Sequence, residues 1–121
     1  MMTIPYKSHG RDERGVDCYG LVKLLYKQEQ GIDIVDFDYK DPNDPQNEHF
    51  YFDNLENPRW TKVEPQKGCV VALRAMGYIS HCGYMVSDTE FLHITEKTGV
   101  ARVSIFSPKW EKRIVGFYKY D

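Results

Sequence analysis

The chain has 121 residues, of which 41% are hydrophobic and 28% charged, and its formal net charge is −2. This length is enough for one domain with a single buried core. The small negative charge gives no electrostatic basis for binding nucleic acid or an anionic membrane, and no apolar run reaches the roughly 18 residues of a membrane-spanning helix. The composition therefore predicts a single globular domain over residues 1–121, with no nucleic-acid or membrane partner.

The N-terminal residues and the cysteines bear on where the chain works. Residues 1–15, MMTIPYKSHGRDERG, lack the apolar core of a signal peptide, so we expect no export signal. The chain has three cysteines, an odd number that argues against a disulfide framework. We therefore expect reduced thiols.

An amphipathic helix is predicted after a polar loop at residues 3–16. Asp17 suits the N-cap of this helix, and Gly31 fits its C-terminal end. Apolar residues at positions i, i+3, i+4 and i+7 predict one buried face: Cys18, Leu21, Val22 and Leu25. The side chains expected to face outward are those of Lys23, Lys27 and Gln28.

Cys18 would lie in the first turn of this helix, among unpaired N–H groups at the positive end of the helix dipole. This environment favours the thiolate, so we expect the pKa of Cys18 to lie below its ordinary value of about 8.5. The alternative is that Cys18 is a small buried hydrophobe. Gly20 lies inside the helix, where glycine costs about 1 kcal/mol relative to alanine. This cost indicates that another chain segment or a ligand approaches the backbone closely at Gly20.

Residues 33–66 have many acidic residues and no clean periodicity, which predicts a long irregular segment with one short helix at most. We expect the acidic part, Asp33 to Glu56, to be a solvated loop, although it could line a substrate cleft or dock a partner. Asp41, Asn43 and Asp44 faintly resemble a calcium loop, but the spacing lacks the glycine and terminal glutamate of an EF-hand.

From Cys69 onward the apolar pattern has a period of two, and turn residues separate short runs of β-branched and aromatic residues. Five strands are expected, at residues 69–74, 81–86, 90–95, 99–105 and 113–120. The connections are too short for crossovers, so the sheet should be antiparallel. A helix followed by such a sheet gives an α+β fold.

Two histidines of the predicted sheet are expected to lie on one face. If their strands form a hairpin in which Val86 faces Glu90, the pairing places His93 opposite Gly83. His81 and His93 are then diagonal neighbours with Cβ atoms roughly 7–8 Å apart or less, a gap that two imidazoles can bridge. A slip of one residue would put them on opposite faces.

A thiol, a histidine beside it and a second polar group together form the nucleophile, base and orienting group of acyl transfer. In this interpretation Cys18 attacks, His81 takes the thiol proton, and His93 fixes the tautomer and ring plane of His81. The alternative is that both histidines are structural residues of the sheet.

Zinc is a competing interpretation, because Cys69, His81, Cys82 and His93 carry suitable ligand atoms. His81 and Cys82 are adjacent in a strand, however, so their side chains should point to opposite faces. No CxxC pair is present. The pattern therefore disfavours zinc and indicates that Cys69 and Cys82 are hydrophobic residues of the core.

The stretch DCYGLV, followed about sixty residues later by HCGYMV and EFLHIT, resembles the NlpC/P60 family of cysteine peptidases, whose usual signature is DCSGLV and then HVGIY and FIHA. The upstream PYKSHGRDERGVDCYGLV is similar to the phage tail members of that family, and so is the final RIVGFYKY. The resemblance runs from about Ile4 to Tyr120, nearly the whole chain.

The resemblance implies a papain-like α+β domain that cleaves peptides of the bacterial cell wall, commonly between D-γ-glutamyl and diaminopimelate or lysine. It assigns Cys18 as the nucleophile, His81 as the general base and His93 as the orienting residue. Tyr6 matches a tyrosine often found beside the nucleophile, where its hydroxyl would help to bind the oxyanion, together with the backbone N–H of Cys18. It implies no metal or organic cofactor. The implied setting is a phage tail, or the host cytoplasm before assembly.

The chain departs from the family pattern at four places, none of them in the triad. Tyr19 replaces the usual serine after the nucleophile, and Cys69 stands where a GDL motif usually has its aspartate. Cys82 replaces a valine, and His9-Gly10 stands where two glycines are common. These differences bear on substrate choice and on the shape of the cleft.

Two other functions remain open from the sequence. The chain could be a structural tail-tip component that keeps the fold but acts by contact, with the acidic segment and aromatic residues such as Tyr51 and Phe52 as its docking surface. It could also be an acyltransferase or amidase on another substrate, since these use the same thioester chemistry.

Overall fold

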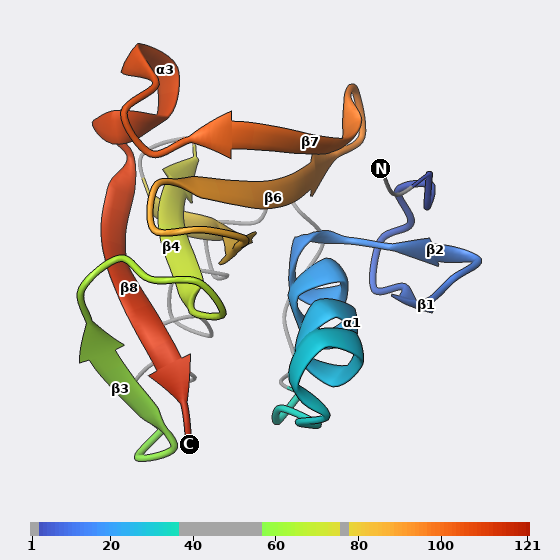
Figure 1. Cartoon of the computed structure of the whole chain (residues 1–121). Helices are drawn as coiled ribbons and strands as arrows, with labels where there is room; N and C mark the ends of the chain where they lie inside the picture. Colours follow the sequence, from blue (N-terminus) through green and yellow to red (C-terminus); the bar gives the residue numbers. More distant parts are fainter. Residues whose placement is uncertain (1–2, 37–56, 76–77) are drawn as a thin grey trace.

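The structure is a computed structural model that describes residues 3–36, 57–75 and 78–121 (Figure 1). Its elements in chain order are β1 (Arg11–Asp12), β2 (Gly15–Val16), α1 (Cys18–Gln30), β3 (Trp60–Val63), β4 (Val70–Ala75), β5 (Tyr78–Met85), β6 (Glu90–Thr95), β7 (Gly99–Ser104), α3 (Pro108–Glu111) and β8 (Ile114–Tyr120). No helix within these ranges is long and apolar enough to cross a membrane.

The described strands form an antiparallel six-stranded sheet in the order β3-β8-β4-β5-β6-β7, together with a two-stranded ribbon of β1 and β2. The α+β fold class is therefore confirmed. The prediction of five strands was wrong, because β3 lies inside the segment expected to be irregular and pairs with β8. The polar loop at residues 3–16 also contains β1 and β2, and the connection between the last two predicted strands contains α3.

Helix α1 begins and ends as its sequence predicts. The side chain of Asp17 accepts a hydrogen bond from the N–H of Gly20 at 2.8 Å. Gly31 closes the helix in a left-handed conformation with φ of 68°, and its N–H donates to the carbonyl of Lys27 at 3.0 Å. Such a conformation is favourable for glycine because it has no Cβ.

The sheet has an apolar cluster on each face, as strand alternation requires. Helix α1 packs on β5 and β6, and its apolar residues form the first cluster together with the sheet residues that face it. That cluster includes Leu21, Val22, Val70, Cys82, Tyr84 and Ile94. The opposite cluster contains Cys69, Val71, Leu73, Met85, Phe91, Ile105 and Trp110. Cys69 and Cys82 are both buried, in agreement with their predicted place in the core.

Candidate active site

The site begins at the N-terminus of α1, where Asp17 holds several backbone and side-chain donors. Besides capping the helix, its carboxylate accepts from the backbone N–H of His9 and from the guanidinium of Arg11, both at 2.9 Å. Asp17 is only 3% exposed, so these bonds supply the partners that a buried carboxylate requires. Cys18, the first residue of the helix, is half-buried. Its thiol thus lies in the first turn of α1, at the positive end of the helix dipole.

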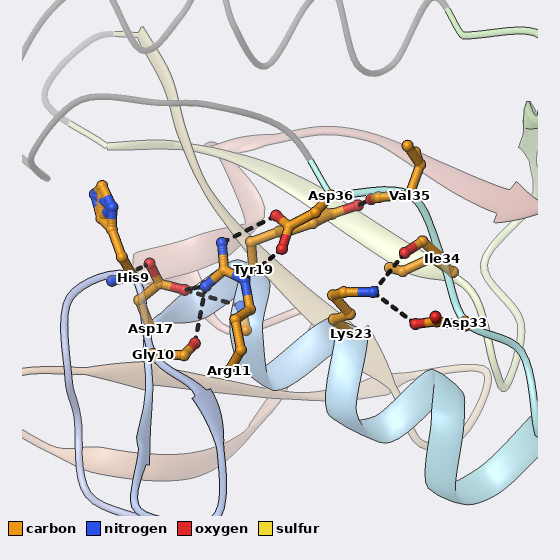
Figure 2. Close-up of polar contacts among 11 residues, drawn as sticks. His9, Gly10, Arg11, Asp17, Tyr19, Lys23, Asp33, Ile34, Val35 and Asp36 are labelled. Atoms are coloured by element: carbon orange, nitrogen blue, oxygen red, sulfur yellow. Dashed lines mark hydrogen bonds and ion pairs between the residues drawn. The ribbon is translucent and has the colours of Figure 1, made fainter.

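Figure 2 shows that Arg11 also ties the loop before α1 to the segment after it. The Arg11 guanidinium donates to both carboxylate oxygens of Asp36, at 2.9 and 3.1 Å, and to the carbonyl of Gly10 at 2.8 Å. The hydroxyl of Tyr19 donates to the carbonyl of Val35. Tyr19, where the family usually has serine, therefore fixes the segment that follows the helix.

Lys23 was predicted to face outward, but it too binds this segment. Its ammonium donates to the carboxylate of Asp33 at 2.6 Å and to the carbonyl of Ile34 at 2.7 Å. The side chains of Arg11, Tyr19 and Lys23 thus attach residues 33–36 along one side of α1 (Figure 2).

Gly20 is required because another chain segment approaches it, as its position predicted. A Cβ on Gly20 would lie 2.1 Å from the carbonyl oxygen of Gly10. His9, just before Gly10, has a φ of 61°, the left-handed conformation that a glycine adopts without strain. The backbone at the usual glycine pair is therefore kept, although His9 now carries a side chain there.

A second thiol lies against Cys18. Cys82, on the α1 side of β5, is 3% exposed and hydrogen-bonds with Cys18. Burial raises the pKa of the Cys82 thiol well above its ordinary value, and the hydrogen bond with Cys18 raises it further. Cys82 therefore remains protonated, and its S–H is available to a Cys18 thiolate.

We expect Cys82→Val to move the alkylation of Cys18 to higher pH. Valine fills a similar volume but has no donor, so the Cys18 thiolate loses a stabilising hydrogen bond. A rise of about half to one pH unit in the midpoint is expected. The measurement is the rate of iodoacetamide labelling of the Cys18 peptide against pH, read by mass spectrometry. Cys69→Val, on the opposite face of the sheet, is the matched control, and an unchanged midpoint in Cys82→Val would contradict the donor role.

His81 and His93 meet as their predicted register requires. Tyr84 pairs with Leu92, and Met85 with Phe91, which is the alignment expected for this hairpin. Nε2 of His81 lies 2.8 Å from Nδ1 of His93. The histidines are 8% and 3% exposed, so this pair is largely protected from water.

The protonation of His93 determines what the pair can do. Burial, followed by the charge of His81, lowers the pKa of His93 to about 4, although a Cys18 thiolate acts in the opposite direction. His93 is therefore neutral at neutral pH, and its Nδ1 can accept a hydrogen bond. In the tautomer in which His81 donates from Nε2 to this acceptor, its Nδ1 carries no proton, and this is the form that a general base needs.

Cys18 is linked to the histidine pair by one hydrogen-bonded neighbour and by its charge. It hydrogen-bonds with Cys82, which directly follows His81 in β5, and a Cys18 thiolate is near enough to raise the pKa of His93. Tyr6, half-buried, forms a parallel bridge with Val16, two residues before Cys18. The four residues assigned by the resemblance thus come from the loop before α1, from its first turn, and from the two strands on which α1 packs: Tyr6, Cys18, His81 and His93.

The rival sites of the sequence are not assembled in the described part of the chain. Among residues 3–36, 57–75 and 78–121, no three histidine, cysteine or acidic side chains are grouped as metal ligands. His81 and Cys82 lie on opposite faces of β5, as strand alternation predicts. The faint calcium pattern at 41–44 and most of the acidic segment lie outside the described residues.

Three residues of the site were missed or given other roles by sequence reasoning. Cys82 was interpreted as core only, although its replacement of the family's valine marked it as unusual. Arg11 carries no periodic signal, and its two carboxylate partners are separated along the chain. Trp110, whose ring lies against both histidines, stands in the connection between the last two predicted strands, to which no role was given.

The fold is shared with solved structures. The NlpC/P60 domain of the peptidoglycan hydrolase SagA aligns with a TM-score of 0.62 and 18% identity, over 99% of this chain and 89% of that one. A protein described as similar to a lipoprotein of the NLP/P60 family, from Staphylococcus aureus subsp. aureus Mu50, aligns with a TM-score of 0.63 and 18% identity. That match covers 96% of this chain and 36% of the other.

Sequence comparison gives the same family. The murein DD-endopeptidase MepS/murein LD-carboxypeptidase of Escherichia coli K12 is 26% identical over 110 residues, and strains O6:H1 and O157:H7 have relatives with the same name and identity. The match covers 91% of this chain, which spans about half, 52%, of the length of these relatives. The NlpC/P60 family itself matches residues 3–119. The chain therefore belongs to the NlpC/P60 family.

Proposed function

We propose that the chain is a cysteine endopeptidase that hydrolyses the stem peptides of peptidoglycan. The observation that carries this proposal is the 2.8 Å bond between His81 and His93, on the two strands against which the helix that begins with Cys18 packs. The names of the relatives support the substrate, since they describe a murein endopeptidase and carboxypeptidase and a peptidoglycan hydrolase.

The acylation half of the reaction follows from the state of the two histidines. Nδ1 of His81 takes the proton of the Cys18 thiol, which requires these two atoms to be within hydrogen-bond reach. Sγ of Cys18 then attacks the amide carbonyl to form a tetrahedral oxyanion. His81 gives its proton to the amine as the C–N bond breaks, and a thioester remains on Cys18. His93 stays neutral and continues to accept the Nε2–H of His81.

Hydrolysis of the thioester returns the site to its first state. His81 removes a proton from a water molecule, which attacks the thioester carbonyl. The carboxylic acid product forms and the Cys18 thiolate is restored. In both halves the oxyanion is bound by the backbone N–H of Cys18 and by the hydroxyl of Tyr6, the roles that the family resemblance implies for these groups.

The peptidoglycan bond that is cleaved and the biological setting of the protein are the more specific parts of the proposal. The family resemblance favours the bond between D-γ-glutamyl and diaminopimelate or lysine, in a protein of a phage tail. The names of the relatives describe DD-endopeptidase and LD-carboxypeptidase activities instead. These bonds release fragments of different mass, so one digestion distinguishes them.

The test is digestion of purified diaminopimelate-type peptidoglycan with the wild-type chain and with Cys18→Ala. We expect the wild type to release stem-peptide fragments that mass spectrometry identifies, and Cys18→Ala to release none, because alanine has no nucleophile. Thermal unfolding of both chains checks that the substitution leaves the fold intact.

Two results would contradict the proposal. If neither chain releases fragments although Cys18 of the wild type is alkylated as a thiolate, peptidoglycan is not the substrate of this chain. If Cys18 is also inert, a structural role in a phage tail becomes the better explanation. Binding to tail subunits that persists in Cys18→Ala would support that role.

A further inference from the structure

The ring of Trp110 lies against both histidines of the candidate active site. It stacks on His81 with ring centroids 5.7 Å apart and an interplanar angle of 28°. It contacts His93 edge to face, with ring centroids 4.9 Å apart and an interplanar angle of 73°. One indole thus lies against the two rings that share the 2.8 Å hydrogen bond. The ring of Phe91 contacts His93 as well, with ring centroids 5.5 Å apart.

The segment that carries Trp110 is firmly held at the sheet. The backbone N–H of Trp110 donates to the carbonyl of Ser107 at 2.9 Å. The backbone carbonyl of Trp110 accepts from the N–H of Arg113 at 2.8 Å. The carbonyl of Arg113 in turn accepts from the N–H of Arg74 in β4, at 2.8 Å. Trp110 is 8% exposed and belongs to the apolar cluster that includes Ile105. The indole is therefore a fixed part of the core and not a mobile surface residue.

Two cations lie over the same indole. The ammonium of Lys109 and the guanidinium of Arg113 are each 5.4 Å from the ring centroid. These positive charges stabilise the indole by cation–π contact. Besides burial, the charges of His81 and Lys109 lower the pKa of His93, whereas a Cys18 thiolate on α1 raises it.

We propose that Trp110 is a positioning residue, whose ring excludes water from the bond between His81 and His93 and keeps His93 as the neutral acceptor. The inference rests on the proposed function, in which His81 is the base. Without the indole, water would reach both rings and compete for Nε2 of His81 and Nδ1 of His93. His93 would then bind a proton more easily, and its protonated Nδ1 could no longer accept a hydrogen bond from His81. His81 would lose its fixed tautomer.

The test is an NMR titration of the imidazole nitrogens in the whole chain, in the wild type, Trp110→Ala and Trp110→Phe. We expect the midpoint of His93 to rise by about one to two pH units in Trp110→Ala and by less in Trp110→Phe, since phenylalanine retains part of the cover. The nitrogen shifts of His81 should change from one dominant tautomer toward a mixture. Trp60→Phe is the control, because Trp60 packs against Tyr26 and Tyr120, away from the histidines.

The control variant supplies a second measurement. The chain has two tryptophans, so Trp60→Phe leaves Trp110 as its only indole emitter. Because Trp110 stacks on His81, protonation of the pair should quench this emission, with a midpoint that matches the NMR titration.

These readouts need no peptidoglycan, so they separate this inference from the proposed function. If Trp110→Ala fails to fold, Trp110→Phe carries the test. If His81 and His93 titrate as in the wild type in every folded variant of Trp110, the positioning role is overturned. If they shift as expected but wild-type protein does not cleave peptidoglycan, the indole still covers the pair, and only the proposed reaction is wrong.

Discussion

His81→Gln is expected to lower kcat/KM on a synthetic stem peptide by about 10³-fold, within the range that a general acid–base contributes. Glutamine can still donate an N–H toward Nδ1 of His93, so the core around the pair has a partner for that atom. Its amide cannot take the proton of Cys18 at neutral pH, and it cannot give a proton to the departing amine. The measurement is the rate of peptide cleavage, with thermal unfolding of the same samples as the check on the fold.

Two further exchanges to glutamine make this prediction specific. His93→Gln should lose less activity, about 10- to 100-fold, since an amide oxygen can accept the Nε2–H of His81 and leave the base in place. Lys97→Gln changes an exposed side chain in the turn after β6 and should keep the wild-type rate. Retention of more than a tenth of the activity in His81→Gln would show that His81 is not the base.

Gly20→Ala is expected to destabilise the fold by about 3 kcal/mol or more, the upper range for overpacked sites. Helix propensity alone would make Gly20→Ala more stable by about 1 kcal/mol. A loss of stability would therefore show that the steric clash outweighs helix propensity. The new methyl group would meet the carbonyl oxygen of Gly10 at 2.1 Å, and neither backbone can move without breaking the bonds of Asp17. Urea unfolding followed by circular dichroism measures the difference.

The same exchange at the other end of the helix is the control. Gly31 has a positive φ, but no neighbouring atom lies within 4 Å of the position that a Cβ would take there. Gly31→Ala should therefore cost only the backbone strain of a left-handed alanine, about 1 kcal/mol. If Gly20→Ala were no less stable than Gly31→Ala, the close approach of the Gly10 carbonyl would not be what requires glycine at position 20.

The features that could be predicted from the sequence are those that local chemistry determines. The N-cap at Asp17 and the end at Gly31 depend on residues within one turn of each helix end. The meeting of His81 and His93 depends on a short hairpin, in which one assumed pair of facing residues determines every other pair. The need for glycine at position 20 could also be predicted, because glycine inside a helix lowers stability and is expected only where another segment approaches the backbone closely.

The features that were missed depend on contacts far apart in the chain. Strand β3 is short and pairs with the last strand, β8, which itself lies between β3 and β4. No periodicity within either segment encodes that order. Trp110 reaches the histidines only because α3 brings the chain back over the sheet, and Arg11 finds Asp36 across the whole length of the helix.

Cys82 also bears on the second half of the proposed reaction, in which the Cys18 sulfur must depart from the acyl group. A thiolate stabilised by a donor is less basic, which makes it a weaker nucleophile but a better leaving group. In that reaction, the S–H of Cys82 as a donor would slow attack by each thiolate and speed the breakdown of the thioester. Valine, the usual family residue, would move the slow step toward deacylation. One buried side chain in β5 thus influences which half of the cycle limits turnover, although it takes no part in the bonds that form and break.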